Sequence, residues 1–307
     1  MTRTFARRHG ALAGFLAVLV IGTVATAAPV AGLPAPLSKG WGWVLAAGTV
    51  SGVDQNARTA TLAIVGQGRL ETFEGGGNWR RQVVTGSQVV HLLPGTVIAD
   101  GSDEPATLAA IHPGAPATVW GVVKPDASVL GLKVLVTTAV PRQSPVSSIT
   151  PSRPGGVSGA VLRSSGGMLE LLSAQGARRS IIVTGATTVR KASGIVPAAM
   201  IAPYDIVRVE GAVNADGSVA ATRIEVELEA GSAVQVASPL DQVFGEVEGL
   251  VVGGVMIPIP TGCYFIKGSG PGAFKQLTPG QTVTVYGAPI TSGTTSVGLR
   301  ARVVVWR

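Results

Sequence analysis

The chain has few of the residues from which catalytic and metal sites are built. Its 307 residues include one cysteine, three histidines and only 13% charged residues. A lone Cys263 excludes an intramolecular disulfide, and so few cysteines and histidines provide no zinc-ligand cluster. No Gly-x-Ser-x-Gly nucleophile elbow is present. We therefore expect no catalytic residues, no metal and no cofactor, and we favour a non-enzymatic protein.

Charged residues are too scarce for long solvated helices, whereas turn-forming residues are abundant. The chain has 42 glycines and 20 prolines, and 46% of its residues are hydrophobic. Gly and Pro at this density separate short strands, and the hydrophobic residues can fill cores between them. The composition predicts an all-β protein.

A motif of the form Ile/Leu-x-Pro-x-x-x-Ala/Val-x-Val-x-Gly occurs three times. Its copies end at Gly121, Gly211 and Gly287, which are 90 and 76 residues apart. Repeats of this length are small domains rather than solenoid units. The motif predicts three tandem domains in which Val119, Val209 and Val285 occupy equivalent buried positions.

Within the second unit the pattern indicates five or six short strands, with one helical turn in 194–202. Alternation over 206–213 places one face of that strand in a core, and Gly211 would permit a bulge. So few strands around so small a core favour a closed or half-closed barrel of the oligonucleotide/oligosaccharide-binding (OB) type. The alternative is a pair of packed sheets.

These units resemble an exported bacterial β-domain family of unknown function, the domain-of-unknown-function 5666 type, often found in tandem. The resemblance rests on the Gly-x-Val opening strand, Thr187-Thr188-Val189, and the proline motif, which 279–287 fits best. Tyr204 replaces the glycine that follows proline in the other copies. The resemblance implies fold and export, and it transfers no catalytic residues.

The N-terminus has the pattern of a signal peptide. Three arginines precede an apolar run over 11–24, and Ala25-Thr26-Ala27 supplies small residues for cleavage. The alternative is an uncleaved anchor, which would be the chain's one membrane contact. Removing residues 1–27 takes away three arginines and no acidic residue, so the net charge falls from +7 to +4. We expect an extracellular, periplasmic or envelope-associated protein.

The predicted organisation follows from these signals and from two proline-containing junctions. We assign a signal peptide (1–27), a lead-in (28–46), β-domain 1 (47–138), a Pro/Ser-rich linker (139–155), β-domain 2 (156–230), a linker (231–242) and β-domain 3 (243–307).

One segment combines aromatic and basic residues in a way that could bind a ligand. Trp79, Arg80 and Arg81 follow Gly75-Gly76-Gly77, so we predict that a flexible tip presents an indole and two guanidinium groups. Such a tip could stack on a sugar or base and hold an anionic group. The alternative is a hairpin loop whose Trp79 folds back over the barrel.

Two other patterns predict structure rather than function. Glu225, Glu227 and Glu229 alternate on one strand, which favours a solvated face neutralised by Arg178, Arg179 or Arg223 over a Ca²⁺ site. The glycine-rich segment 268–272 is followed by no helix long enough to hold a phosphate, so we expect a plain loop.

Three functions remain open from the sequence. The favoured one is a non-enzymatic binding or scaffold protein of the cell envelope, whose partner could be an envelope polymer or another envelope protein. A binder of anionic polymer, polysaccharide or nucleic acid through the barrel faces is the second, although nucleic acid is not expected. A secreted hydrolase with an unrecognised carboxylate site is the third.

Cleavage after Ala27 is testable by intact-mass measurement of the protein purified from its native host. We expect a mature chain that begins at Ala28, because the cleavage site has small residues at both required positions. A membrane-bound species that retains Met1 to Ala27 would show an anchor instead.

Overall fold

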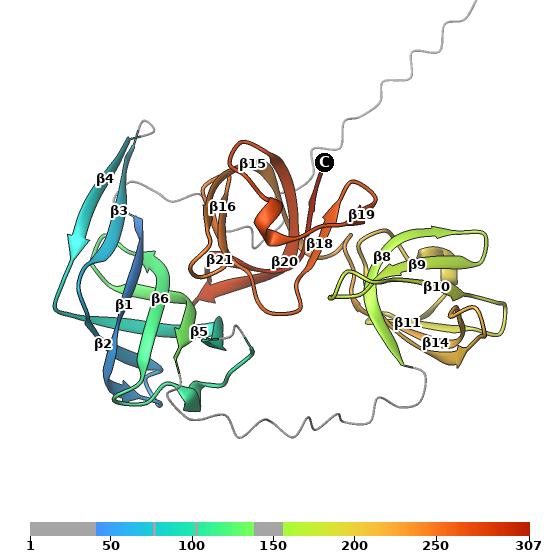
Figure 1. Cartoon of the computed structure of the whole chain (residues 1–307), viewed down its shortest axis with the longest axis horizontal. Coiled ribbons are helices and arrows are strands. Elements are labelled where there is room, and N and C mark those ends of the chain that lie inside the picture. The colour runs from blue at the N-terminus through green and yellow to red at the C-terminus, as the bar shows by residue number, and fades with distance from the viewer. Residues whose placement is uncertain (1–40, 76–77, 102–103, 138–155) are drawn as a thin grey trace, which may run out of the picture. The chain divides into compact units, whose positions relative to one another are not determined.

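Three sheets of seven strands each make up the computed structural model, which describes residues 41–75, 78–101, 104–137 and 156–307 (Figure 1). The predicted signal peptide, most of the lead-in and the Pro/Ser-rich linker lie outside the described residues. The all-β, OB-like fold is confirmed, with more strands per unit than the five or six expected. Within these ranges no helix is long and apolar enough to span a membrane.

The first barrel closes with five strands and carries an extra hairpin. Its ring runs β1–β2–β5–β7–β6 and back to β1, with β5 and β7 parallel. The elements are β1 (Gly42–Asp54), β2 (Thr59–Ile64), β3 (Gly68–Gly75), β4 (Asn78–Val84), β5 (Ser87–Asp100), η1 (Leu108–Ala110), β6 (Pro116–Val123) and β7 (Val129–Val136). Because β1 begins at Gly42, the predicted start at residue 47 is too late.

The second barrel has the same ring order, β8–β9–β10–β14–β13, with β10 and β14 parallel. This order, with the third strand parallel to the fifth, is the OB arrangement. Its elements are β8 (Val157–Ser165), β9 (Met168–Leu172), β10 (Arg178–Ile182), β11 (Thr188–Lys191), β12 (Gly194–Val196), η2 (Ala198–Met200), β13 (Ile206–Val213) and β14 (Val219–Leu228). The predicted helical turn is η2, and the β11–β12 hairpin extends the sheet beyond β14.

The third barrel repeats the order β17–β16–β15–β20–β21, and β18 runs parallel to β21 as β11 does to β14. Its elements are β15 (Val234–Phe244), β16 (Gly249–Val252), β17 (Val255–Pro258), β18 (Tyr264–Lys267), β19 (Gly270–Pro271), η3 (Phe274–Gln276), β20 (Thr282–Ser292) and β21 (Thr295–Trp306). Since β15 begins at Val234, most of the predicted linker 231–242 belongs to this barrel.

The proline motif forms the same backbone clamp in each barrel. The residue after proline donates its N–H to the first ring strand, and that strand donates one back to the following residue. In the first barrel Gly114 donates to Val50 at 2.8 Å and Val50 donates to Ala115 at 2.9 Å. In the second barrel Tyr204 donates to Val161 at 2.7 Å and Val161 donates to Asp205 at 2.8 Å. In the third barrel Gly280 donates to Leu240 and Leu240 donates to Gln281, both at 2.8 Å.

The clamp requires a left-handed turn residue, which explains the glycines and makes Tyr204 an exception. The φ angle is 86° at Gly114 and 90° at Gly280, and it is 73° at Tyr204. A side chain in this region costs about 1–2 kcal/mol. The ring of Tyr204 lies 5.6 Å from that of Tyr286 in the third barrel, a contact that offsets part of the cost. Burial raises the pKa of Tyr286, and the neighbouring Tyr204 raises it further.

The closing glycine of the motif marks a β-bulge in all three barrels. The ladder register shifts at Gly121, Gly211 and Gly287. A Cβ on Gly211 would lie 2.1 Å from the carbonyl oxygen of Ala220, and the other two glycines meet carbonyls at 2.4 and 2.1 Å. The predicted bulge at Gly211 is therefore present, and only glycine allows the partner strand so close.

Each barrel encloses its own apolar core. Val119, Val209 and Val285 are 5%, 0% and 0% exposed and lie in three separate clusters, as the motif predicts. Two further clusters join barrels. One combines Trp43 and Trp120 of the first barrel with Phe244 of the third, and the other combines Leu172 of the second with Tyr264 of the third. The third barrel therefore contributes to both junctions.

Replacing Gly211 by Ala should lower the free energy of unfolding by about 1–3 kcal/mol, because the new methyl overlaps the Ala220 carbonyl. Gly185→Ala is the matched control, since nothing lies within 4 Å of a Cβ at that position. Urea unfolding of both variants measures the difference. Equal stability of the two would contradict the steric role of the bulge glycine.

Candidate functional site

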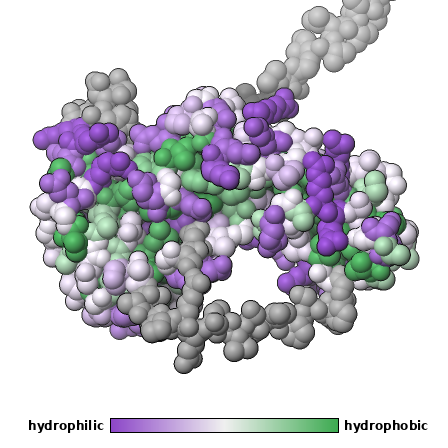
Figure 2. All heavy atoms as spheres, in the orientation of Figure 1, coloured by the Kyte–Doolittle hydropathy of each residue, from purple (hydrophilic) through white to green (hydrophobic). Residues whose placement is uncertain are grey.

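The hairpin β3–β4 is an insertion between the second and third ring strands of the first barrel. β3 pairs with the N-terminal end of β1, and β4 pairs with β3 alone. The turn residues 76 and 77 lie outside the described residues. On the face seen in Figure 2, hydrophilic residues gather over this hairpin. It is the element that carries the predicted binding residues.

The structure places all three predicted residues in a strand rather than in a loop. Trp79 pairs with Phe73, Arg80 with Thr72 and Arg81 with Glu71. The prediction of a flexible tip carrying these residues is wrong, because the ladder continues past them to Asn78. The side chain of Trp79 lies outside what the structure describes. Strand alternation puts Arg80 and Arg81 on opposite faces of the hairpin.

Arg81 is held by a buried carboxylate and still faces solvent. Its Nε and Nη2 donate to Oε1 of Glu71 at 2.8 and 2.7 Å. The Glu71 side chain is 7% exposed, whereas that of Arg81 is 75% exposed. The carboxylate therefore fixes one edge of the guanidinium, and its remaining N–H groups can meet a second anionic group.

Arg69, which lies in β3 of this hairpin, and Arg58, which precedes the hairpin, contact the barrels themselves. Arg69 lies 5.1 Å from the ring centre of Trp43 and 5.8 Å from that of Phe244, so its guanidinium covers the junction with the third barrel. Arg58 donates to the carbonyls of Leu92 and Leu93 at 3.0 and 3.3 Å. The basic character of the hairpin thus comes from Arg80 and Arg81.

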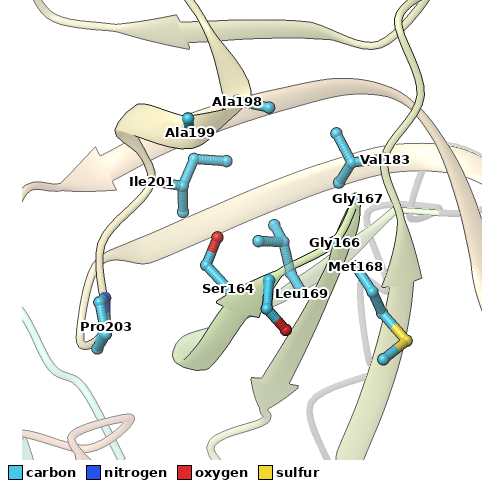
Figure 3. Close-up of a pocket in the computed structure, with 11 residues that line it drawn as sticks. Ser164, Gly166, Gly167, Met168, Leu169, Val183, Ala198, Ala199, Ile201 and Pro203 are labelled. Atoms are coloured by element: carbon cyan, nitrogen blue, oxygen red, sulfur yellow. The ribbon is translucent and has the colours of Figure 1, made fainter.

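A cavity of about 320 Å³ opens at one end of the second barrel (Figure 3). The β8–β9 turn, with Gly166 and Gly167, forms one side, and the segment around η2 forms the other. Leu169, Val183 and Ile201 supply apolar walls, and hydroxyls of Ser164 and Ser165 are its polar groups. No charged side chain lines it, so it suits a small apolar group rather than acid–base chemistry.

A second cavity, of about 360 Å³, lies at the junction of the first and third barrels. Trp43 and Val251 line it together with Asp241, Gln242 and Gly254. Asp241 Oδ2 accepts the backbone N–H of Gly254 at 2.8 Å. Asp241 is the one carboxylate among the residues that line this cavity, whereas glycoside hydrolysis by the common mechanism uses two.

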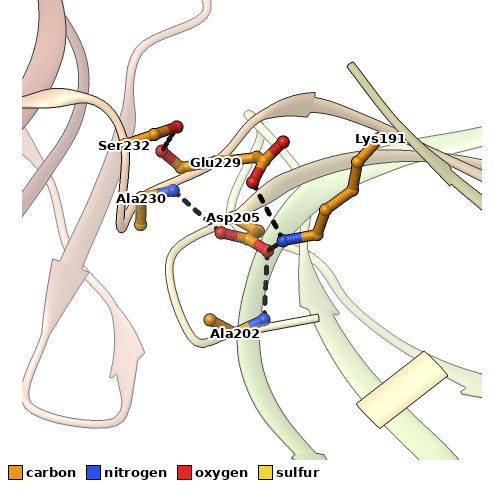
Figure 4. Close-up of polar contacts among 6 residues, drawn as sticks. All are labelled: Lys191, Ala202, Asp205, Glu229, Ala230 and Ser232. Carbon is orange, nitrogen blue, oxygen red and sulfur yellow. Dashed lines mark hydrogen bonds and ion pairs between the residues drawn. The ribbon is translucent and has the colours of Figure 1, made fainter. Parts of the chain in front are cut away.

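The most buried charged cluster supports the second barrel's clamp (Figure 4). Asp205 is fully buried and accepts the N–H groups of Ala202 at 3.0 Å and Ala230 at 2.8 Å. Lys191 Nζ lies 3.6 Å from Asp205 and 3.2 Å from Glu229. Every carboxylate oxygen of Asp205 has a partner, so the cluster ties the turn to the end of β14. Sequence reasoning missed it because its members are far apart in the chain.

The alternating glutamates form the predicted charged face, with different partners from those expected. Glu225 pairs with Arg223 at 3.8 Å, as predicted, whereas Glu227 pairs with Arg208 at 3.7 Å and Glu229 with Lys191. Arg178 pairs with Glu170 instead. Among the described residues no group of three potential ligands could hold a metal.

Neither the cysteine nor the glycine-rich loop joins a reactive site. Cys263 is 5% exposed, and burial raises the pKa of its thiol. Residues 268–272 lead to the three-residue η3, which is too short to bind an anion at its N-terminus. His91 and His112 are both exposed, and His112 Nδ1 lies 3.1 Å from the carbonyl of Pro113.

One family model matches part of the chain. A model described as "Domain of unknown function (DUF5666)" matches residues 169–225, from β9 into β14. This stretch includes the second proline motif, so the predicted resemblance is confirmed there. No curated protein matched the chain.

Two solved structures are similar at low identity. A structure described as "drosophila Unr CSD456" is 12% identical over 84% of this chain and 96% of that one, with a TM-score of 0.18. A deletion mutant of the single-stranded DNA binding protein from Thermus aquaticus is 14% identical over 64% of this chain and 96% of that one, with a TM-score of 0.16. Similarity at this level carries no information about function.

Cys263 should resist alkylation in the folded protein. Its buried thiol has a raised pKa and the thiolate is the reactive form, so iodoacetamide at pH 8 should react at least about a hundredfold more slowly than with unfolded protein. Mass spectrometry with and without guanidinium measures both rates. Rapid labelling of folded protein would place the thiol at an accessible surface.

Proposed function

We propose that this protein is an exported, non-enzymatic binding or scaffold protein of the cell envelope. The observation that carries the proposal is the pair of apolar clusters through which the third barrel packs against the first and the second. Barrels that bury such faces against one another hold their remaining surfaces at fixed positions, which is what a scaffold requires.

The contact between the first and third barrels has the composition of a permanent interface. The ring of Phe244 lies 4.7 Å from that of Trp43 and 5.3 Å from that of Trp120. Beside them Lys133, which is fully buried, donates from Nζ to the carbonyl of Ile259 at 2.8 Å. Aromatic residues of this size contribute most of the energy in stable interfaces. Both barrels lie within the unit Ala31–Arg307.

Export is supported by the N-terminal sequence, and the absence of paired carboxylates from the cavities supports a binding role. The arginines, apolar run and Ala25-Thr26-Ala27 site are those of a cleaved signal peptide. Neither of the two cavities described above, of about 320 and 360 Å³, is lined by two carboxyl groups.

A second candidate function is binding of an anionic polymer through the β3–β4 hairpin. Arg81 favours it, because its guanidinium is oriented by Glu71 yet is 75% exposed. Arg80 is also exposed, and Trp79 could add stacking. The hairpin is then the surface that the scaffold presents.

Substitutions in the hairpin separate this function from a structural role. Trp79→Ala should weaken binding of dextran sulfate by about 1–3 kcal/mol and leave the melting temperature nearly unchanged. Arg80→Gln and Arg81→Gln should each flatten the dependence of affinity on salt, because fewer counterions are released. Arg300→Gln, an exposed arginine of the third barrel, is the control.

The opposite pattern would show that Trp79 stabilises the barrel rather than contacting a ligand. In that case Trp79→Ala lowers the melting temperature and leaves binding per folded molecule unchanged. Equal effects of Arg81→Gln and Arg300→Gln on the salt dependence would show that the hairpin is not the binding surface.

A further inference from the structure

The β3–β4 hairpin leaves a long strand edge in a protein that otherwise closes or buries its edges. The first two rings return to their first strands through backbone pairing. The outermost strands of the second and third sheets, β12 and β19, have three and two residues, and all four residues of β17 are buried. β4 has seven residues and pairs on one side only. It is the longest accessible edge in the described part of the chain.

The side chains along this edge have a consistent chemistry. Arg80 is exposed, the Arg81 side chain is 75% exposed, and Val83 is 60% exposed. β4 contains no acidic residue. An added strand would therefore meet one arginine on each face of the ladder, and on the face of Arg81 an apolar group two residues beyond it. Cross-strand pairs of opposite charge stabilise a ladder, and like charges directly opposite destabilise it.

We propose that β4 binds an extended acidic segment of another protein as an additional strand of the first sheet. The proposal rests on the proposed function of the hairpin as a ligand-contacting element, and it names the partner. Backbone N–H and C=O groups on the side of β4 away from β3 supply the main-chain hydrogen bonds of strand addition, and the exposed guanidinium of Arg81 selects carboxylates on the face of the incoming segment that it meets.

The same edge disfavours a second copy of this chain. Full antiparallel pairing of two β4 strands over Asn78–Val84 is centred on Arg81, so each Arg81 would face its counterpart. Glu71 already accepts the Nε and Nη2 groups of Arg81 within its own hairpin, and β4 itself has no carboxylate to relieve that contact. Charge complementarity thus favours an acidic partner over self-association.

The test uses capped seven-residue peptides of alternating valine and glutamate, titrated by fluorescence anisotropy into the full chain. Two further peptides carry N-methyl groups on only the valines or only the glutamates. In an added strand alternate N–H groups face β4, so methylation in one frame should weaken binding by about tenfold or more and methylation in the other should do little. A valine–lysine peptide is expected not to bind.

Because the N-methyl series leaves the protein unaltered, it avoids a variant that fails to fold. Arg81→Gln should weaken the glutamate peptide severalfold, and Arg300→Gln should leave it unchanged. If both methylated peptides bind as well as the parent, strand addition is wrong, and competition by dextran sulfate would then leave the anionic-polymer function standing. Absence of peptide binding also overturns strand addition, and the dextran sulfate titration decides the proposed function separately. A dimer in sedimentation that is lost in Val83→Pro would assign the edge to a second copy.

Discussion

The backbone clamp between the proline turn and the first ring strand is the contact on which each barrel depends. Its two N–H···O=C bonds join segments about 40 to 65 residues apart, such as Gly114 with Val50 and Tyr204 with Val161. Immediately beyond the clamped residue the first strand bulges. The fifth strand bulges opposite the closing glycine of the fourth, at Gly121, Gly211 or Gly287. Strands bent in this way can curve into a ring, so the motif encodes closure rather than chemistry.

Much of the fold was predictable because the motif combines local turn chemistry with a strand pattern. Val209 alternates with charged neighbours and is buried, and Gly211 permits the bulge. The starts of the first and third barrels were placed too late, because the pairing of Gly42 with Val123 and of Val234 with Gly287 leaves no local trace. Tyr204 looked like a departure from the motif, yet it adopts the same left-handed turn and contacts Tyr286.

The candidate site was less predictable because its partners come from tertiary structure. Arg81 and Trp79 were identified from their neighbours, but a run of glycines indicated a loop where the chain continues as a paired strand. Nothing local shows that Glu71 would be buried beneath Arg81, or that Arg69 would lie over Phe244 more than 170 residues away. The sequence shows which residues are charged, whereas the contacts that orient a charged side chain depend on which strands become neighbours in the fold.

The buried face of the first barrel bears on the order in which the molecule can be completed. Trp120 and Leu132 are fully buried in a cluster that includes residues of the third barrel, and Lys133 donates to the carbonyl of Ile259, 126 residues later in the chain. Synthesis proceeds from the N-terminus, so the first barrel can close its ring while that face still has no cover. An uncovered face of this kind is prone to aggregate at that stage. The chain is thus most in need of a chaperone after its first domain has folded and before its last has been made.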